Sequence, residues 1–443
     1  MADYGSGQMR TPWGNADQLR ERMLRPGPGI PRDDVVRSQR ERLFAATVAC
    51  IAEKGYEATV VADLLELSGV SRSAFYEHFR DKEDCLLATF DAIVAMAIER
   101  FEEELDKNGS WDKRGRNALD VLLKAIVRQP AAARLCFSDV YTVGERGRLT
   151  VERAMQRFAV LVGDMIEKLR GGGGALPADL VLGLLGGAQS VVQSQLRRGD
   201  ADESLLAHGN DLWDWALSYE PPGTPLRVTG RRSRPVEAHP PPFVAYSQAE
   251  RIIRALAASA GERGYPAVTI AEIAARASVS QATFYSHFAD KHAALVAALD
   301  SAGSQMLGFV MPAARRAPDW ENGVRAAIGA LCAFYASEPN LARLVAVETY
   351  AAGPEALDQR DRANAEIRAL LGPGLETMPQ MKPIVGDAAL GAVWTSLYTQ
   401  IVNEGPQALP QIAPLATYMV LAPFLGPGKA LKVSNGDGRA RGQ

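Results

Sequence analysis

Two four-residue stretches, Ser71–Ala74 and Ser280–Thr283, each begin with a serine and continue with residues that carry hydrogen-bonding or methyl groups. A serine oxygen can accept a free N–H at the start of a helix, so each serine is expected to cap the segment that follows it. In the first turn of such a helix, Arg72 could pair with guanine, Gln281 with adenine, and Thr283 with a thymine methyl. The chemistry indicated is the reading of base edges in DNA.

Each stretch lies inside a longer shared pattern, Val60–Phe79 (VVADLLELSGVSRSAFYEHF) and Thr269–Phe288 (TIAEIAARASVSQATFYSHF). In both, an apolar segment with helical spacing is followed by a turn that ends in Val-Ser and by a second short segment that ends in Phe-Tyr-x-His-Phe. Asp-Lys then opens a longer helix. Two short helices joined by a tight turn predict a helix-turn-helix unit, whose second helix can lie in the major groove.

The apolar residues of each pattern are expected to form the core of a small head, and the polar residues to face DNA. The expected core residues are Val70, Phe75, Phe79, Val279, Phe284 and Phe288. Phosphate contacts, which fix register without reading sequence, are expected from the tyrosine, histidine and lysine of each pattern, with capping or packing an equal alternative for His78. The full set of expected DNA contacts is Thr59, Ser71, Arg72, Ser73, Ala74, Tyr76, His78, Lys82, Thr269, Ser280, Gln281, Ala282, Thr283, Tyr285, His287 and Lys291.

The two patterns differ at the turn and at the start of the preceding helix. Ser278 stands where the first pattern has Gly69, and serine costs of order 1 kcal/mol if that position needs a positive φ angle. Thr269 and Glu272 can form a capping box, whereas the first pattern begins with Val60 at that N-cap. Each head is therefore expected to be imperfect in a different place.

The similarity continues beyond these patterns at a constant offset of 209 residues (264 − 55). The matching pairs include Gly55 and Gly264, Trp111 and Trp320, Pro130 and Pro339, Tyr141 and Tyr350, and Gly144 and Gly353. A repeat of this length in one register predicts a duplicated domain rather than an array of short repeats.

The repeated unit resembles the TetR family of bacterial transcription regulators. The residues that carry the resemblance are Leu64, Gly69, Val70, Ser71, Phe75, Tyr76, His78, Phe79 and Lys82 in copy one, and Thr269, Ile273, Ala274, Val279, Ser280, Phe284, Tyr285, His287, Phe288 and Lys291 in copy two. The resemblance implies an all-α fold in which each unit has a three-helix head and a helical effector and dimerisation domain. It also implies a sequence-specific transcriptional regulator, in the first instance a repressor, that a small-molecule effector releases from its operator.

Composition and the repeat together predict the domain boundaries. Gly, Pro and Arg richness indicates that both ends of the chain are disordered and that a stiff linker joins the copies. The expected ranges are a tail over 1–36, a head over 37–97, a regulatory domain over 98–219, a Pro/Arg linker over 220–245, a second head over 246–306, a second regulatory domain over 307–428 and a tail over 429–443.

The ends of the two copies predict how the chain assembles. The resemblance implies that each unit buries its last two helices against a partner's, and this chain holds both sets, 178–197 with 202–218 and about 385–403 with 407–423. We therefore expect an intramolecular pseudo-dimer and, because the third helices differ, a double-stranded operator with unlike half-sites. A homodimer of tandem chains stays open as an alternative, and so does a helical scaffold that no longer reads DNA.

Aromatic residues of the regulatory domains could line effector cavities between helices, although aromatics at helical spacing are more often plain core. The candidates are Trp111, Phe137, Tyr141, Phe158, Trp320, Phe334, Tyr350 and Trp394. The sequence does not identify the effector or the target genes. It also does not distinguish repression from activation.

The remaining composition argues for a non-enzymatic, cytoplasmic protein. The net charge is −3 over 443 residues, so DNA affinity must come from the placement of charge rather than its total. The four cysteines are scattered, without a CxxC pair, so no metal site or disulfide framework is expected. The sequence carries no GxSxG, P-loop or HExxH motif, and no cofactor is expected.

Overall fold

The computed structural model describes residues 9–24, 29–172, 174–199, 203–222, 226, 247–377 and 382–437. The chain divides into two compact units. Unit 1 holds Met1–Phe158 with Val192–Gly209, and unit 2 holds Ala159–Val191 with Asn210–Gln443. The fold class is all-α, as expected, and within the described ranges the β-structure is one short hairpin.

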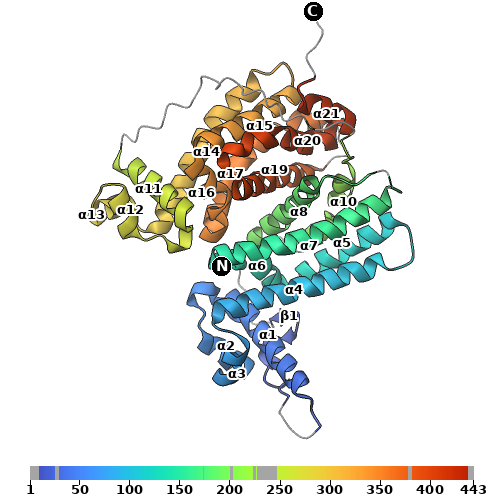
Figure 1. The fold of residues 1–443 in the computed structure, drawn as a ribbon, viewed down its shortest axis with the longest axis vertical. Coiled ribbons are helices and arrows are strands. Elements are labelled where there is room, and N and C mark those ends of the chain that lie inside the picture. Colours follow the sequence, from blue (N-terminus) through green and yellow to red (C-terminus); the bar gives the residue numbers. More distant parts are fainter. Residues whose placement is uncertain are drawn as a thin grey trace, which may run out of the picture. The chain divides into compact units, whose positions relative to one another are not determined.

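Unit 1 begins with a hairpin and a three-helix head (Figure 1). The hairpin pairs β1 (Arg10–Thr11) with β2 (Gly14–Asn15) and is followed by the 3₁₀ helix η1 (Ala16–Gln18). The head consists of α1 (Arg32–Ala58), α2 (Val61–Ser68) and α3 (Arg72–His78), and α4 (Lys82–Leu105) leads out of it. Gly55 adopts φ 79° inside α1 and so breaks that helix, as its sequence position predicted.

Copy one continues with helices whose starts follow from local sequence. Ser110 caps α5 (Trp111–Arg128), and a proline in the first turn begins α6 (Pro130–Phe137). These are followed by η2 (Asp139–Val143), α7 (Glu145–Leu169), α8 (Ala178–Arg198), α9 (Glu203–Ala207) and α10 (Gly209–Leu217).

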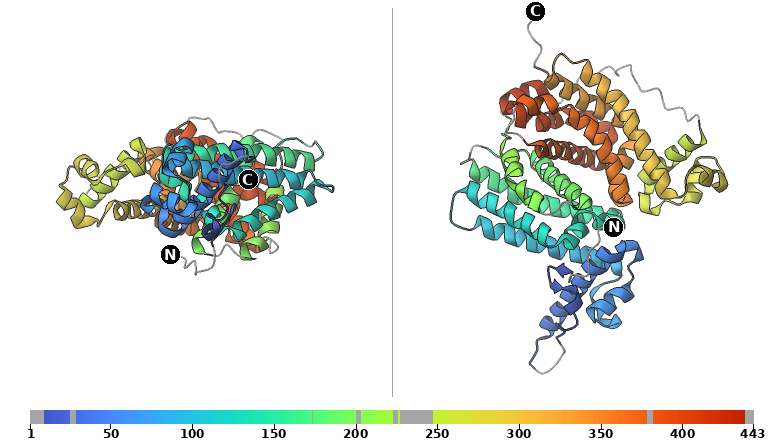
Figure 2. Two further views of the ribbon diagram at one scale, coloured as in Figure 1. Left: turned by 90° about the horizontal axis from the view of Figure 1, so that it is seen from below. Right: turned by 180° about the vertical axis from the view of Figure 1, so that it is seen from behind.

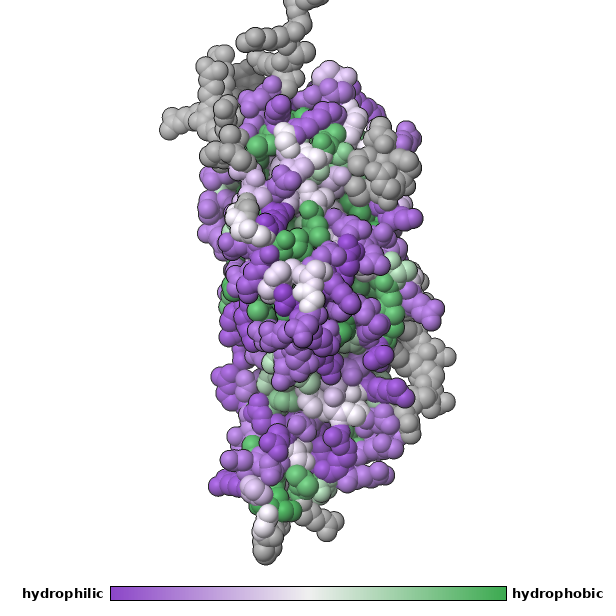
Figure 3. All heavy atoms as spheres, turned by 90° about the vertical axis from the view of Figure 1, so that its right-hand side faces the viewer, coloured by the Kyte–Doolittle hydropathy of each residue, from purple (hydrophilic) through white to green (hydrophobic). Residues whose placement is uncertain are grey.

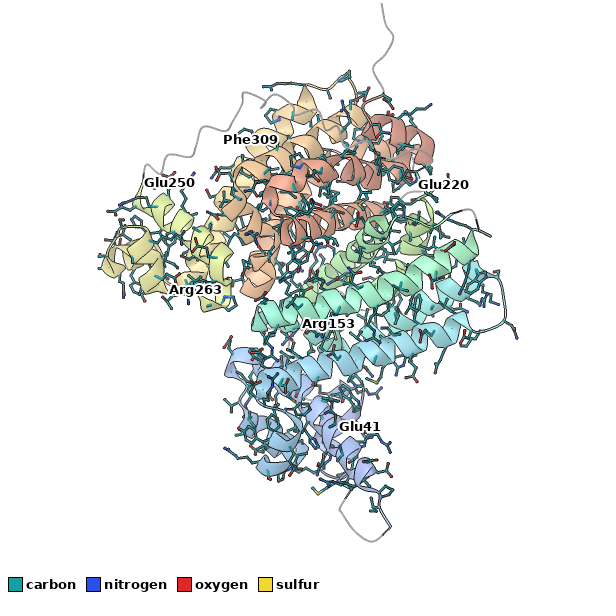
Figure 4. The ribbon with its side chains drawn as sticks, in the orientation of Figure 1. Glu41, Arg153, Glu220, Glu250, Arg263 and Phe309 are labelled. Atoms are coloured by element: carbon teal, nitrogen blue, oxygen red, sulfur yellow. The ribbon has the colours of Figure 1, made fainter. Side chains whose placement is uncertain are left out.

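Copy two repeats this order in unit 2. Its head is α11 (Gln248–Arg263), η3 (Tyr265–Ala267), α12 (Ile270–Arg276) and α13 (Gln281–His287). The elements that follow are α14 (Lys291–Arg315), α15 (Trp320–Ser337), α16 (Pro339–Ala346), η4 (Glu348–Ala352), α17 (Pro354–Ala369) and α18 (Gly372–Thr377). From the third head helix to the sixth helix, each element starts 209 residues after its counterpart (281 − 72 and 339 − 130), so the register of the sequence repeat is also a structural register. Glu41 and Glu250, labelled in Figure 4, mark the equivalent first helices α1 and α11.

Copy two ends in α19 (Pro383–Asn403), η5 (Pro406–Ile412), α20 (Ala413–Leu425) and α21 (Pro427–Ser434). By length and composition, the segments Lys291–Arg315 and Pro406–Leu425 are apolar enough to cross a membrane. Within the protein, however, 44% and 67% of their most apolar windows are buried. On the face drawn in Figure 3, hydrophobic residues form separate small patches among hydrophilic ones. We assign both segments as core helices.

The expected disorder at the two ends is wrong for the parts that the structure describes. Leu19 is fully buried against α1, and Trp13 packs on Phe44 with ring centroids 5.1 Å apart. At the other end, Ala430 and Val433 of α21 are buried. Few apolar residues suffice here because each inserts into a cluster formed by other helices, which local composition does not reveal. Residues 1–8, 25–28 and 438–443, and most of the linker over 220–245, lie outside the described residues.

The heads have the expected aromatic core, with one difference. Val70, Phe75 and Phe79 are buried in head one, and Phe284 is buried in head two. In head two, however, the expected core residues Val279 and Phe288 are only half-buried. The ring of Phe79 has Phe44 as a neighbour at 6.0 Å, whereas the residue at the corresponding position of copy two is the smaller Ile253, so Phe288 has no such ring beside it.

Within unit 2, the last helices of copy one pack against those of copy two (Figure 2). We call the contact between residues 183–190 of α8 and residues 388–395 of α19 the seam. A Cβ built on Gly186 would lie 1.9 Å from Oγ1 of Thr395, and one built on Gly391 would lie 2.6 Å from Cβ of Ser190. The two backbones therefore approach so closely that only glycine fits at these positions.

Two tyrosines beside the seam exchange hydrogen bonds. The hydroxyl of Tyr219, just after α10, donates to the carbonyl of Met419 at 2.6 Å. The hydroxyl of Tyr418 in α20 donates to the carbonyl of Glu220, labelled in Figure 4, at 2.8 Å. Each tyrosine thus bonds to the residue that follows the other tyrosine, which is the reciprocity that a two-fold axis produces.

Candidate nucleic-acid interface

In head one, the turn between α2 and α3 places a short capped helix at the surface. Gly69 ends α2 with φ 64°, and the Ser71 hydroxyl accepts a hydrogen bond from the Ala74 backbone N–H at 3.2 Å. Arg72 and Ser73 are exposed on the first turn, whereas Ala74 is half-buried against the head core. Among the described residues, Arg72 forms no ion pair, so its guanidinium is available to a ligand.

Head two has the same geometry with different side chains. The Ser280 hydroxyl accepts from the Thr283 backbone N–H at 2.9 Å and also lies 2.8 Å from the Thr283 hydroxyl. Gln281 and Ala282 are exposed on the first turn. The cap engages the Thr283 hydroxyl and leaves its methyl group as the part suited to a thymine methyl. Both serine caps predicted from the sequence are confirmed.

The expected phosphate contacts divide into exposed tyrosines and histidines that already have partners. Tyr76 and Tyr285 are 52% and 55% exposed, and each stands edge-on to the buried phenylalanine before it. Nε2 of His78 lies 2.9 Å from the Gln39 side-chain oxygen. Burial, and then the charge of Arg40, lower the pKa of His78, so its neutral form is favoured. Nε2 of His287 lies 3.3 Å from the equivalent glutamine, Gln248.

Lys82 and Lys291, expected as phosphate contacts, bond to carbonyls of their own heads. Nζ of Lys82 donates to the carbonyls of Tyr56 at 3.0 Å, Glu57 at 3.3 Å and Thr59 at 2.9 Å. The three hydrogens of an ammonium group are then all engaged. The equivalent bonds of Lys291 reach Tyr265, Pro266 and Val268, so both lysines tie the end of the first helix to the start of the fourth.

Thr59 is wrong as a DNA contact. It is 2% exposed, and its hydroxyl donates to the carbonyl of Gly55 at 2.7 Å. Thr269 instead caps α12 by accepting from the Glu272 N–H at 3.3 Å. The expected capping box of head two is thus only half formed, because the Glu272 carboxylate pairs with Arg263 at 2.9 Å.

The candidate effector aromatics pack against neighbours within their own unit. In unit 1, Phe158 meets Phe101 edge-on, the Arg114 guanidinium lies 3.6 Å from the Trp111 ring centroid, and Phe137 packs on the Leu123 cluster. Tyr141 in η2 is buried.

The same holds for the candidates of copy two. Trp320 meets Phe424, Phe334 meets Phe309, Arg360 stacks on Tyr350, and Nε1 of Trp394 donates to Asn364 at 2.8 Å. None of the eight candidates lines either of the two surface grooves that follow.

The sequence did not predict these two grooves, which occupy equivalent positions. The first, of about 920 Å³, lies between α4 and α7 and includes Leu87, Asp91 and Arg153, the last labelled in Figure 4. The second, of about 630 Å³, lies between α14 and α17, where the corresponding residues are Val296, Asp300 and Arg362. They could have been found by comparing charged residues, rather than aromatic ones, at the 209-residue offset, because Asp91 and Arg153 correspond to Asp300 and Arg362.

An acidic and a basic side chain meet beside each groove, and the two helices that supply them are exchanged between the copies. Arg146 of α7 pairs with Glu83 of α4 at 2.5 Å. At the same offset in copy two, Glu355 of α17 lies 3.0 Å from Nε2 of His292 in α14. The two regulatory domains therefore differ chemically where they join their heads.

The folds and surfaces described so far define a double-headed, all-α helix-turn-helix protein. The model of the bacterial regulatory proteins of the tetR family matches the chain twice, at residues 43–89 and 252–299. Each match falls on one of the two heads, so the chain carries two regions that match this family's model.

Several relatives align with part of the chain. The HTH-type transcriptional regulator CymR of Pseudomonas putida is 30% identical over 28% of this chain and 61% of its own length. The HTH-type transcriptional activator FasR of Mycolicibacterium smegmatis is 32% identical over 32% of this chain and 64% of its own length. The chain thus spans about three-fifths of the length of these relatives. Among solved structures, FadR of Bacillus subtilis in complex with stearoyl-CoA is 19% identical, covers 40% of this chain and 97% of its own, and has a TM-score of 0.37.

Proposed function

We propose that this protein is a cytoplasmic, sequence-specific DNA-binding transcriptional regulator, a repressor that a small-molecule effector releases from its operator. The observation that carries the proposal is the pair of capped third helices, α3 and α13, which present exposed first turns at the same place in two heads. Exposed tyrosines one turn later are suited to phosphates, and the first turns are suited to base edges.

The two heads are proposed to work as one intramolecular pseudo-dimer. The reciprocal bonds of Tyr219 and Tyr418 support this arrangement, because isologous interfaces exchange equivalent contacts. Since Arg72 and Gln281 occupy equivalent positions, the operator is proposed to have unlike half-sites. Light scattering at micromolar concentration separates the two assemblies: one chain's mass, 47.7 kDa, supports the pseudo-dimer, and twice that mass supports a homodimer of tandem chains.

A gel-shift titration on the DNA upstream of the protein's own gene tests the proposed function. Affinity is expected to fall steeply with salt, because phosphate contacts release counterions. Arg72→Ala and Gln281→Ala are each expected to weaken binding to one half-site by roughly 1–3 kcal/mol without changing the salt slope. Lys124→Ala, a change on α5 away from the heads, is the matched control. Affinity that ignores both salt and the two substitutions would contradict the proposal.

A second candidate function is a helical scaffold that keeps the head fold without reading DNA. The observation that favours it is the neutralisation of charge around the heads. Lys54 pairs with Asp63 at 2.8 Å, and Arg276 pairs with Glu262 at 2.6 Å. The ammonium groups of Lys82 and Lys291 are likewise occupied. The gel shift decides between the two candidates, because a scaffold predicts no salt-dependent complex.

A further inference from the structure

The contacts of the seam come in reciprocal pairs once the two helices are aligned by their own ends. Helices α8 and α19 both have 21 residues and correspond at an offset of 205 (383 − 178). At this offset Gly391 is the counterpart of Gly186, and Thr395 is the counterpart of Ser190. Gly186 faces Thr395, and Gly391 faces Ser190.

The second pair of contacts is reciprocal in position but not in residue type. A Cβ built on Gly183 would lie 2.5 Å from Cε of Met419 in α20 and 3.7 Å from Cβ of Ala392, and Gly187 lies against Ala388. At the same offset, Ala388 is the counterpart of Gly183, and Ala392 is the counterpart of Gly187. Copy one therefore contributes two glycines where copy two contributes two alanines, and each glycine meets an alanine.

A Cβ at position 187 has no room. Built on Gly187, it would lie 2.4 Å from the carbonyl oxygen of Ala388 and 2.5 Å from the Trp215 ring. A backbone carbonyl cannot move aside as the end of a flexible side chain can, so the helices themselves would have to separate.

The consequence appears when two identical helix faces are paired in the geometry of the seam. Two α19 faces would put Ala392 in the place of Gly187, so its methyl group would lie on the Ala388 carbonyl of the other face. Two α8 faces would put glycine opposite glycine and leave the volume of the alanine methyl groups unfilled. Close-packed interfaces tolerate neither change well.

We propose that the seam selects the unlike half: the α8 face of copy one accepts the α19 face of copy two, and pairing between like halves is excluded. This inference rests on the proposed pseudo-dimer and adds the residues that enforce it. The partner that fits is a helix with alanine at two positions one turn apart and threonine in the next turn, which α19 supplies. The tyrosine exchange beside the seam matches the same pairing.

Crossed rescue variants of the full-length protein test the proposal by thermal unfolding without DNA. Gly186→Ala places a Cβ 1.9 Å from Oγ1 and 2.5 Å from Cβ of Thr395. We expect it to lower Tm by on the order of 5 °C. Adding Thr395→Gly removes the obstructing atoms and is expected to restore most of that loss. Adding Ser190→Gly instead is expected to restore none, because Gly186 would face Ser190 only if like halves paired.

The reciprocal experiment exchanges the rescuers. Gly391→Ala is expected to be rescued by Ser190→Gly and not by Thr395→Gly. Because alanine favours a helix more than glycine does, Gly308→Ala in α14, where an added Cβ meets nothing within 4 Å, gives the baseline for such a change. Rescue is read as the coupling in a double-mutant cycle, which removes the intrinsic effect of each glycine.

Each outcome of the experiment decides the question. Rescue of Gly186→Ala by Thr395→Gly and of Gly391→Ala by Ser190→Gly supports selection of the unlike half. Rescue by the exchanged partners, or Gly186→Ala and Gly391→Ala behaving like Gly308→Ala, overturns it. Since no DNA is present, a failure here is distinguishable from a failure of the proposed DNA binding, which the gel shift measures separately.

Discussion

At the residue scale, Ser278 holds a conformation that side chains rarely adopt. It has φ 53°, the one positive value found for a non-glycine residue in the described ranges, and its counterpart Gly69 has φ 64°. The left-handed region crowds Cβ against the following carbonyl, which costs roughly 1–2 kcal/mol for most residues. The positive φ angle considered in the sequence is therefore present at this turn of both heads, and in head two it falls on a residue with a side chain.

Ser278→Gly is accordingly expected to stabilise head two by about 1 kcal/mol. Gly69→Ser in head one should destabilise by more than the reverse amount, because an added Cβ would also meet Arg20 Cγ at 3.2 Å and Met23 Cε at 3.4 Å. Since a chain of this size need not unfold in one step, hydrogen exchange of the amides of α12 and α2 is the suitable measurement. Equal exchange in wild type and both variants would show that the turn is unstrained.

Lys82 shows how a single side chain can link two helices of a head. Its ammonium group accepts no hydrogen bond and donates three, all to carbonyls after the kink in α1, while its charge lies 4.3 Å from the Tyr56 ring centroid. Two of these carbonyls, those of Tyr56 and Thr59, are partly buried, and replacing the lysine removes a hydrogen bond from a charged donor to each of them.

Lys82→Met is therefore expected to destabilise head one by about 1–3 kcal/mol while leaving the salt slope of DNA binding unchanged. Lys124→Met, which removes only an exposed pair with Asp120, should shift stability by less than about 0.5 kcal/mol. Denaturant unfolding and a gel-shift salt series measure the two effects. A salt slope lowered by about one would return Lys82 to the phosphate contacts.

At the scale of elements, the helix that precedes each turn is capped by half of a capping box. In head one, the Asp63 carboxylate accepts from the Val60 N–H at 2.8 Å, and valine offers no side-chain acceptor in return. In head two, the Thr269 hydroxyl accepts from the Glu272 N–H, and the glutamate is engaged elsewhere. One cap is therefore an ionisable group and the other is not.

This difference predicts unlike responses to acid. The hydrogen bond from Lys54, and then the bond from the Val60 N–H, lower the pKa of Asp63. A lowered folded-state pKa gives stabilisation that is present above the unfolded value near 4 and is lost as pH falls through the folded value. Amides at the start of α2 should thus lose protection below about pH 4, whereas those at the start of α12 should keep it.

Asp63→Asn is the control, because an amide oxygen can still accept from the Val60 N–H but does not titrate. The Glu262–Arg276 pair, which also responds to acid, acts at the far end of α12, whereas the Glu272–Arg263 pair lies in its first turn, so Glu272→Gln is the matching control in head two. Equal acid sensitivity of the two helix starts, or no effect of Asp63→Asn, would contradict the assignment.

The heads and their caps were predictable because residues close together in the sequence determine them. Ser71, Gly55 and Pro130 set helix ends through interactions that span a few residues, and the duplication let each copy check the other. The role of Lys82 was not predictable, because its acceptors lie 23 to 26 residues away on another helix. Its charge alone suggested a phosphate contact. The tyrosine exchange spans 200 residues, a distance at which the sequence pattern carries no signal.

At the scale of the whole molecule, the repeat changes register as it passes from the heads to the ends of the copies. The offset is 209 residues through the heads and the helices that follow, 205 for α8 and α19, and 199 for Tyr219 and Tyr418 (418 − 219). The constant offset of 209 residues covers the heads and the helices that follow them, which must act alike. The offset changes to 205 in the helices of the seam and to 199 at the tyrosines beside it, where the two copies contact each other and each can become specific for the other.

Because the two heads on one chain differ, the operator is expected to be asymmetric. A dimer of identical single-headed chains would instead require a symmetric operator. Arg72→Gln, Ser73→Ala and Ala74→Thr together give α3 the first turn of α13 while keeping the Ser71 cap. The triple variant is expected to prefer a palindrome built from two copies of the half-site that α13 reads, by about 1–3 kcal/mol for each base whose contact changes. Competition binding at constant salt measures this preference. The reverse exchange in α13, Gln281→Arg, Ala282→Ser and Thr283→Ala, is the matched variant and should prefer the other palindrome. If both variants keep the preference of the wild type, the first turns of α3 and α13 do not read the bases.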